Sequence, residues 1–375
     1  MTHGSDGSGP HRFGGGLLTA FEAGRRVALA RVISAVEDQA PGFRDLLIAL
    51  HGRIGRAHRI GITGPPGAGK STLIAALITH WREVGESVAV IAVDPTSPFT
   101  GGALLGDRIR MNEVALDRGV FIRSMATRGS LGGLSLATRE VSDVVDAFGF
   151  DRILVETVGV GQTELDIASA ADSTVVVLVP ESGDGIQAMK AGLMEVSDLF
   201  VINKADRPGA DRVAREISIM LHLRTGRTLR NVPAHHGVDS GRVRRPNARA
   251  TAGGRPAAGD SDAETDPAKP AGWEIPVLQT VSQEGKGVDE LVAALNRHRE
   301  WLEVSGERAL RRRIRLEQRV RDEVDRLLHL RAWRAGQGEP MLESALPALE
   351  AGSTTPYEVA ANIVESVLGK AGQPA

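Results

Sequence analysis

A lysine and a serine stand together at positions 70 and 71, directly after a run of small residues that begins at Gly64. This spacing matches the phosphate-binding loop G-x-x-x-x-G-K-[ST]. Its glycines let successive backbone N–H groups point at an anion, and the positive end of the following helix adds to the attraction. Lys70 would contact the β- and γ-phosphates of a nucleotide, and the Ser71 hydroxyl would bind Mg²⁺. The residues predicted to surround the phosphates are Gly64, Pro65, Pro66, Gly67, Ala68, Gly69, Lys70, Ser71 and Thr72.

A second polar motif, Asn203-Lys204-Ala205-Asp206, directly follows an apolar segment. A carboxylate at this place can accept hydrogen bonds from both the N1–H and the 2-amino group of guanine, whereas adenine offers neither donor. Because an unpaired buried carboxylate is costly, the discrimination between the two bases should be large. We therefore expect Asn203, Lys204 and Asp206 to recognise guanine. Ser282, which follows the next predicted strand, is placed where a loop behind the guanine O6 atom would lie.

Glu156-Thr157-Val158-Gly159 ends another apolar segment, where P-loop proteins carry a second carboxylate linked to Mg²⁺. The usual residue is the Asp of D-x-x-G, and here the longer Glu156 would reach the ion or its bound water. The Gly159 N–H is predicted to contact the γ-phosphate. Asp94 and Asp107 are further candidate ligands of Mg²⁺, although either could instead cap a helix.

The residue after Gly159 bears on the rate of hydrolysis. Many GTPases place a water-orienting Gln there, but this chain has Val160, and Gln162 comes two residues later. We therefore predict slow hydrolysis by the protein alone, and acceleration by a partner that repositions a loop or contributes a charge. Residues 181–195 are a predicted mobile loop, in which Lys190 is either a contact to the transferring phosphate or a partner, or simply an exposed lysine.

Short Val/Ile/Leu-rich segments alternate with helical ones between Ile60 and Ser282, which predicts an α/β fold with a doubly wound, mostly parallel sheet. Strands are expected at 60–63, 87–93, 120–122, 152–156, 173–179, 199–203 and 277–281. We assign residues 57–299 to this P-loop NTPase domain. Residues 17–56 precede it as N-terminal helices, with Pro41-Gly42 dividing the stretch 17–50 into two of them.

Three other segments differ from the domain in composition. Residues 1–16 are polar and glycine-rich, and we predict a disordered tail. Residues 234–272 are rich in Ala, Gly, Pro, Arg and Asp, and we predict a disordered insertion. Residues 300–375 show helical periodicity with an apolar seam along 308–333, which favours a helical region for dimerisation.

Composition excludes several classes of protein. Of 375 residues, 42% are apolar and 25% are charged, as in globular proteins. The net charge of −2 argues against a surface that coats nucleic acid. No apolar run approaches the ~18 residues of a membrane span, and there is no cysteine and no apolar secretory signal. We expect a cytoplasmic protein without a nucleic-acid or membrane partner.

Taken together, these motifs resemble the methylmalonyl-CoA-mutase-associated GTPases, the MeaB/ArgK-like G-protein chaperones once described as lysine/arginine/ornithine transport kinases. The similarity spans about residues 17–368. The stretches that carry it are 61–73, 93–111 (V-D-P-T-S-P-F-T-G-G-A-L-L-G-D-R-I-R-M), 121–134, 156–164 (E-T-V-G-V-G-Q-T-E), 183–195 (G-D-G-I-Q-A-M-K-A-G-L-M-E) and 203–206. The chain departs from the family in its longer 233–272 excursion and in Thr280-Val281-Ser282-Gln283, which replaces the usual T-x-S-A.

The resemblance implies a homodimer of the signal-recognition/metallochaperone (SIMIBI) class of P-loop GTPases. It implies that Asp94, Asp107 and Glu156 serve Mg²⁺, and that Lys190 lies in a third switch that senses the partner. It further implies that GTP hydrolysis gates delivery of adenosylcobalamin to a B12-dependent acyl-CoA mutase and protects or reactivates that enzyme. The client could be a methylmalonyl-, isobutyryl- or ethylmalonyl-CoA mutase.

Two other functions fit a P-loop. A small-molecule kinase would also use the loop for phosphoryl transfer, but kinases rarely need the guanine-reading motif at 203–206, and no acceptor pocket is legible. A nickel-delivery GTPase would need a Cys/His cluster to hold its metal, and the chain shows none.

Overall fold

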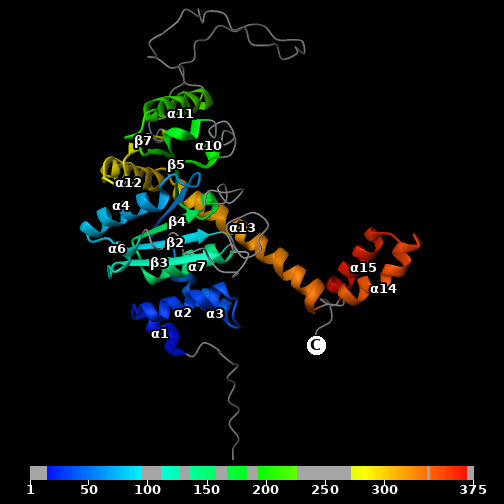
Figure 1. The fold of residues 1–375 in the computed structure, drawn as a ribbon. Coiled ribbons are helices and arrows are strands. Elements are labelled where there is room, and N and C mark those ends of the chain that lie inside the picture. Colours follow the sequence, from blue (N-terminus) through cyan, green and yellow to red (C-terminus); the bar gives the residue numbers. More distant parts are fainter. Residues whose placement is uncertain are drawn as a thin grey trace, which may run out of the picture. The chain divides into compact units, whose positions relative to one another are not determined.

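The computed structural model describes residues 15–94, 111–126, 136–157, 167–183, 193–225, 272–335 and 338–369. The chain divides into two compact units, of which the first ends at Glu307 and the second begins at Arg308 (Figure 1). Each unit is described by itself below. None of the described helices is long and apolar enough to cross a membrane.

The first unit is built on a seven-stranded sheet in the order β3-β2-β4-β1-β5-β6-β7. All neighbouring strands are parallel. The strands are β1 (His58–Thr63), β2 (Val88–Asp94), β3 (Val120–Ala126), β4 (Arg152–Thr157), β5 (Ser173–Leu178), β6 (Leu199–Asn203) and β7 (Val277–Thr280). The central position of β1 confirms the predicted doubly wound parallel sheet of a P-loop NTPase, because successive strands are added on both sides of it.

Alternating side chains send each strand's residues to two different helical layers. In β5, Val175 and Val177 pack with α4 (Lys70–Glu83) and α12 (Val288–Val304). Val176 and Leu178 pack with α11 (Ala210–Thr225) on the opposite face. Further along that second face, α7 (Leu136–Phe148) covers β4 through contacts with Ile153 and Val155. Both faces of the sheet are therefore buried, which explains the near-continuous apolar strands.

The N-terminal stretch forms three helices, so the prediction of two was wrong. They are α1 (Gly15–Glu22), α2 (Arg26–Glu37) and α3 (Phe43–Leu50), followed by the 3₁₀ turn η1 (His51–Arg53). The break at Gly42 is present, and a second one lies at Gly24, whose φ of 73° is left-handed and ends α1. Gly15 and Gly16, assigned to the disordered tail, begin α1. All three helices join the hydrophobic cluster of α7.

The remaining short elements of the first unit are α6 (Asn112–Ala115), α10 (Leu193–Val196), η2 (Ile167–Ser169) and η3 (Pro180–Gly183). The second unit contains α13 (Glu307–Leu330) except its first residue, the π turn η4 (Arg331–Ala335), α14 (Gly338–Glu350) and α15 (Pro356–Gly369). The proposed start of the C-terminal region at residue 300 falls inside α12, and the units instead divide after Glu307. No residue of α13 is buried in the single chain.

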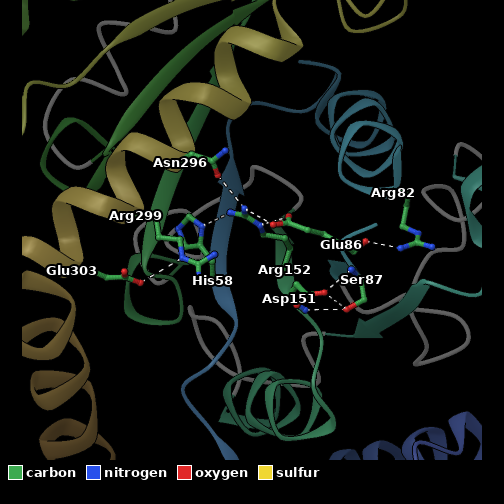
Figure 2. Close-up of polar contacts among 9 residues, drawn as sticks. All are labelled: His58, Arg82, Glu86, Ser87, Asp151, Arg152, Asn296, Arg299 and Glu303. Atoms are coloured by element: carbon green, nitrogen blue, oxygen red, sulfur yellow. Dashed lines mark hydrogen bonds and ion pairs between the residues drawn. The ribbon is translucent and has the colours of Figure 1, made fainter. Parts of the chain in front are cut away.

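Buried polar side chains tie α12 to the amino ends of the strands (Figure 2). Arg152 of β4 pairs with Glu86 at 2.7 and 3.0 Å, contacts His58 Nδ1 of β1 at 3.0 Å and donates to Asn296 Oδ1 of α12 at 3.0 Å. His58 Nε2 lies 2.7 Å from Ser173 Oγ of β5, which lies 2.7 Å from His298 Nδ1 of α12. This network holds three strands and one helix in register, at the edge of the sheet away from the P-loop.

The environment of His58 predicts a loss of stability in acid. Burial, and to a lesser degree Arg152, Arg299 and His298, holds the pKa of His58 well below its ordinary value of 6.5, although Asp172 acts in the opposite direction. Below pH 6.5 His58 is therefore protonated in the unfolded chain but stays neutral in the folded chain. We expect the free energy of unfolding to be unaffected by His58 above pH 6.5 and to fall by about 1 kcal/mol per pH unit below it.

Urea unfolding at a series of pH values from 7.5 to 5 measures this slope. His58→Gln is the matched variant, because an amide can still contact Arg152 and Ser173 but does not titrate. The variant should start less stable and show a shallower acid slope than the native chain. Equal slopes in the two proteins would exclude His58 as the group responsible.

Candidate active site

The loop between β1 and α4 needs glycine at two positions. Gly64 has a φ of 136°, and a Cβ added there would lie 2.0 Å from the backbone oxygen of Val177 in β5. Gly69 has a φ of 85°, and its added Cβ would lie 2.4 Å from Asn203 Nδ2. Both backbones are left-handed and both are crowded, so side chains are excluded. The loop therefore lies directly against β5 and against the start of the guanine motif.

Lys70 is the first residue of α4, and its side chain folds back over the loop. Its Nζ atom donates to the Gly64 oxygen at 2.8 Å and to the Pro65 oxygen at 3.1 Å. Lys70 is buried. Its ammonium group therefore lies at the mouth of a turn whose glycines and helix N-terminus suit a phosphate.

The side chains of Ser71 and Glu156 are in contact although the two residues are 85 positions apart in the sequence. The Ser71 Oγ atom donates to Glu156 Oε1 at 2.9 Å, and both residues are buried. The sheet register explains the encounter, because Glu156 pairs with Ile62 of β1 and points to the face covered by α4. Next to them, Thr157 Oγ1 donates to Thr63 Oγ1 at 3.0 Å. A hydroxyl and a carboxylate oxygen are both ligands that Mg²⁺ favours.

Asn203 connects the phosphate-binding loop (64–72) to the 203–206 motif and to the loop after β7. Its Nδ2 atom donates to the Ala68 oxygen at 2.8 Å. Its Oδ1 atom accepts from Thr280 Oγ1 at 3.1 Å, from the Ser282 N–H at 3.2 Å and from Ser282 Oγ at 2.7 Å. Asn203 thus fixes both the P-loop and the loop after β7. The sequence motif included Asn203 and Ser282 but did not indicate their mutual contact.

The rest of the guanine motif is more open. Lys204 has a φ of 56°, and its Nζ atom donates to the Gly67 oxygen at 2.8 Å, so its stem lies along the P-loop. Asp206 is exposed. Its carboxylate accepts no hydrogen bond and makes no ion pair within the part of the chain that the structure describes. An exposed carboxylate can accept two hydrogen bonds from donors on one edge of a ligand.

These residues share one edge of the sheet, formed by the carboxyl ends of β1, β4, β6 and β7, and this is where parallel α/β sheets bind ligands. Asp94 ends β2 at the same edge, but its side chain lies outside the described structure. Asp107, Gly159 and Lys190 also lie outside the described residues. Within the described part, no three His, Cys, Asp or Glu side chains cluster closely enough to hold a metal ion. Thr63, Thr157 and Thr280 support the site through their hydroxyl groups, to which the sequence motifs assigned no role.

Comparison with known proteins identifies the family of this chain. The model of a protein family described as "Methylmalonyl Co-A mutase-associated GTPase MeaB" matches residues 29–337. The chain belongs to this family. It is consequently a P-loop GTPase that binds guanine nucleotide and hydrolyses GTP, which confirms the family resemblance drawn from the motifs.

Individual relatives cover the chain to different extents. A protein of Pyrococcus abyssi (strain GE5 / Orsay) named as a GTPase is 42% identical over 94% of this chain and 96% of its own length. The mouse "Methylmalonic aciduria type A homolog, mitochondrial" is 40% identical, over 52% of this chain and 50% of its own. A crystal structure of an LAO/AO transport system kinase has a TM-score of 0.61 at 25% identity, covering 93% of this chain and 96% of that one.

Proposed function

We propose that this GTPase is a chaperone that gates the delivery of adenosylcobalamin to a B12-dependent acyl-CoA mutase of the methylmalonyl-CoA mutase type, and that it protects or reactivates that mutase. The observation that carries the proposal is the family match over residues 29–337, whose description names a methylmalonyl-CoA mutase. The name of the mouse relative supports the same partner. A cytoplasmic location, where such a mutase would be met, is part of the proposal.

In this proposal, the nucleotide triphosphate lies in the loop 64–72 and its guanine at Asp206. The contact of Ser71 Oγ with Glu156 Oε1 supports a Mg²⁺ site on these two residues, with Asp94 and Asp107 as further carboxylates. When bound, Mg²⁺ would neutralise charge on the phosphates. Lys70 would hold the β- and γ-phosphates, and the Gly159 N–H would contact the γ-phosphate.

We also propose that the partner completes the catalytic machinery. Val160 stands where many GTPases have the Gln that orients the attacking water, so hydrolysis by the chain alone should be slow. Lys190 is the proposed sensor of the partner. Binding of the mutase would then bring a loop or a charge to the transferring phosphate, and the energy of GTP would be released only when a client is present.

A homodimer is the proposed assembly, formed through the C-terminal helices. Its support is the exposed apolar face of α13, because contiguous exposed apolar side chains are typical of protein–protein interfaces. The exposed residues are Leu310, Ile314, Leu316, Val320, Val324, Leu327 and Leu328. Light scattering on the full chain should give twice the 39.7 kDa of the single chain, and the mass of a monomer would contradict the assembly.

The proposed function is tested by the rate of GTP hydrolysis with and without a mutase. We expect slow release of phosphate by the chain alone and at least a tenfold increase when methylmalonyl-CoA mutase is added, because partner-supplied groups accelerate GTPases by much larger factors. Lys70→Ala serves as the background control. Isobutyryl- and ethylmalonyl-CoA mutases should be tried in parallel, and stimulation by none of the three would contradict the proposal.

The small-molecule kinase stays as a second candidate because the similar solved structure is that of a protein named an LAO/AO transport system kinase. It predicts a different fate for the γ-phosphate. Incubation with γ-labelled GTP or ATP and basic amino acids would place the label on the acceptor in a kinase, and in free phosphate in a GTPase. A labelled amino acid would favour the kinase.

A further inference from the structure

Two cations flank the proposed guanine-binding carboxylate of Asp206. Arg207 follows it directly in the chain, and Lys286 lies in the turn between β7 and α12. The negative charge of Asp206 contributes to raising the pKa of both side chains above their ordinary values, after larger contributions from Glu181 on Arg207 and from Glu284 on Lys286. Both cations therefore lie within the electrostatic reach of the carboxylate.

Each of these cations is nevertheless paired with a different acid. Arg207 Nη1 donates to Glu181 Oε1 at 2.6 Å, and Lys286 Nζ lies 2.6 Å from Glu284 Oε2. Glu181 lies in η3, which follows β5, so the first pair spans two loops. Glu284 lies in the same turn as Lys286, and the turn is closed by the Val281 N–H donating to the Lys286 oxygen at 3.0 Å.

The pairing leaves Asp206 without a partner among the described residues. That state matters for recognition, because guanine needs both oxygens of the carboxylate, one for N1–H and one for the 2-amino group. An arginine side chain is able to take both oxygens of a carboxylate at once. If Arg207 turned to Asp206, it would occupy the atoms that the base must reach.

We propose that Glu181 and Glu284 are specificity-determining positioning residues, which hold Arg207 and Lys286 away from Asp206 and so keep its carboxylate available to guanine. The proposal rests on the assignment of Asp206 to guanine recognition. Neither glutamate touches the nucleotide, and each acts through the cation that it holds. Glu181 has the larger effect, because the guanidinium it holds is the better competitor for a carboxylate.

The size of the effect follows from the exposure of the pairs. Exposed ion pairs change an equilibrium constant by at most about fivefold. Removing the charge of Glu181 frees Arg207 to compete for Asp206 with an interaction of that size. Glu181→Gln should therefore weaken GTP binding about threefold, and it should lower the preference for GTP over ATP by the same factor.

The test compares Glu181→Gln, Arg207→Gln and the double variant by fluorescence titration with GTP and ATP. The single Glu181 variant should lose affinity, whereas the Arg207 variant and the double variant should bind GTP as the native chain does, because they lack the competing cation. A pair that only stabilises the loops predicts the opposite, with both single variants weakened alike. Thermal unfolding of each variant checks that the fold is kept.

Two further measurements sharpen the comparison. Raising KCl from 0.05 to 1 M should shrink the gap between Glu181→Gln and the native chain, because salt screens an exposed competition between charges. Glu303→Gln removes an acid from another exposed pair, Arg299–Glu303 at 3.5 Å, on the part of α12 shown in Figure 2. This control should bind both nucleotides as the native chain does.

The outcomes separate this inference from the assignment of Asp206 to guanine recognition. If Asp206→Asn lowers the GTP preference but Glu181→Gln does not, the positioning role is wrong and the base assignment stands. If Arg207→Gln alone is as weak as Glu181→Gln, the positioning role is again wrong. If Asp206→Asn leaves the preference unchanged, both the base assignment and the inference fall.

Discussion

Replacing Lys70 by alanine is expected to abolish measurable GTP binding. Lys70 is the buried cation at the mouth of the P-loop, and its ammonium group now donates to the Gly64 and Pro65 oxygens at 2.8 and 3.1 Å. With a triphosphate in place, the same group would make charge-assisted hydrogen bonds to two phosphates. Such bonds contribute about 1.5–3 kcal/mol each. Their loss should weaken binding at least about a hundredfold.

Anisotropy of a fluorescent GTP analogue measures this loss directly. The fold should survive, because Lys70 Nζ donates to oxygens of its own loop and not to a distant element. Far-UV circular dichroism and the unfolding midpoint are the controls. An alanine variant that binds the analogue within about threefold of the native chain would show that the phosphates lie elsewhere.

Asp206→Asn should reduce the preference for GTP over ATP by about a hundredfold. The amide keeps the shape of the carboxylate but replaces one acceptor by an N–H₂ donor, which would face the donor edge of guanine. A polar group left unpaired in this way is penalised strongly. Xanthine carries a carbonyl oxygen where guanine has its 2-amino group, so the variant should gain affinity for xanthosine triphosphate.

Competition titrations with GTP, ATP and xanthosine triphosphate test both parts of this expectation. The gain for the xanthine nucleotide guards against the trivial result that the variant is merely damaged. An unchanged ratio of GTP to ATP affinity, with no gain for xanthosine triphosphate, would remove Asp206 from base recognition.

The sheet was predictable because most of its strands contain a continuous apolar run. The expected segment 199–203, for example, coincides with β6, whose residues are all buried. The elements that the sequence misplaced are those that a single glycine ends. Gly24 splits the N-terminal stretch, and Gly306, with a φ of 74°, follows the last turn of α12 near the boundary between the two units. Helical periodicity on both sides hides such positions, because it does not report a left-handed backbone.

The motifs of the site were also predictable, because each is contiguous in the chain. The contacts between residues of different motifs were not predictable. Ser71 meets Glu156 only because β1 lies beside β4 in a register that pairs Ile62 with Glu156. The pair Arg207–Glu181 is of the same kind, since it depends on β5 lying next to β6. Contacts of this type need the strand order, which no local pattern supplies.

The central claim is that one guanine nucleotide binds across the P-loop and Asp206. Isothermal titration calorimetry of the full chain with GTP and magnesium, and separately with ATP, tests it most directly. We predict saturable binding of GTP at one site per chain and much weaker binding of ATP. No heat with GTP, or equal affinity for the two nucleotides, would contradict the account.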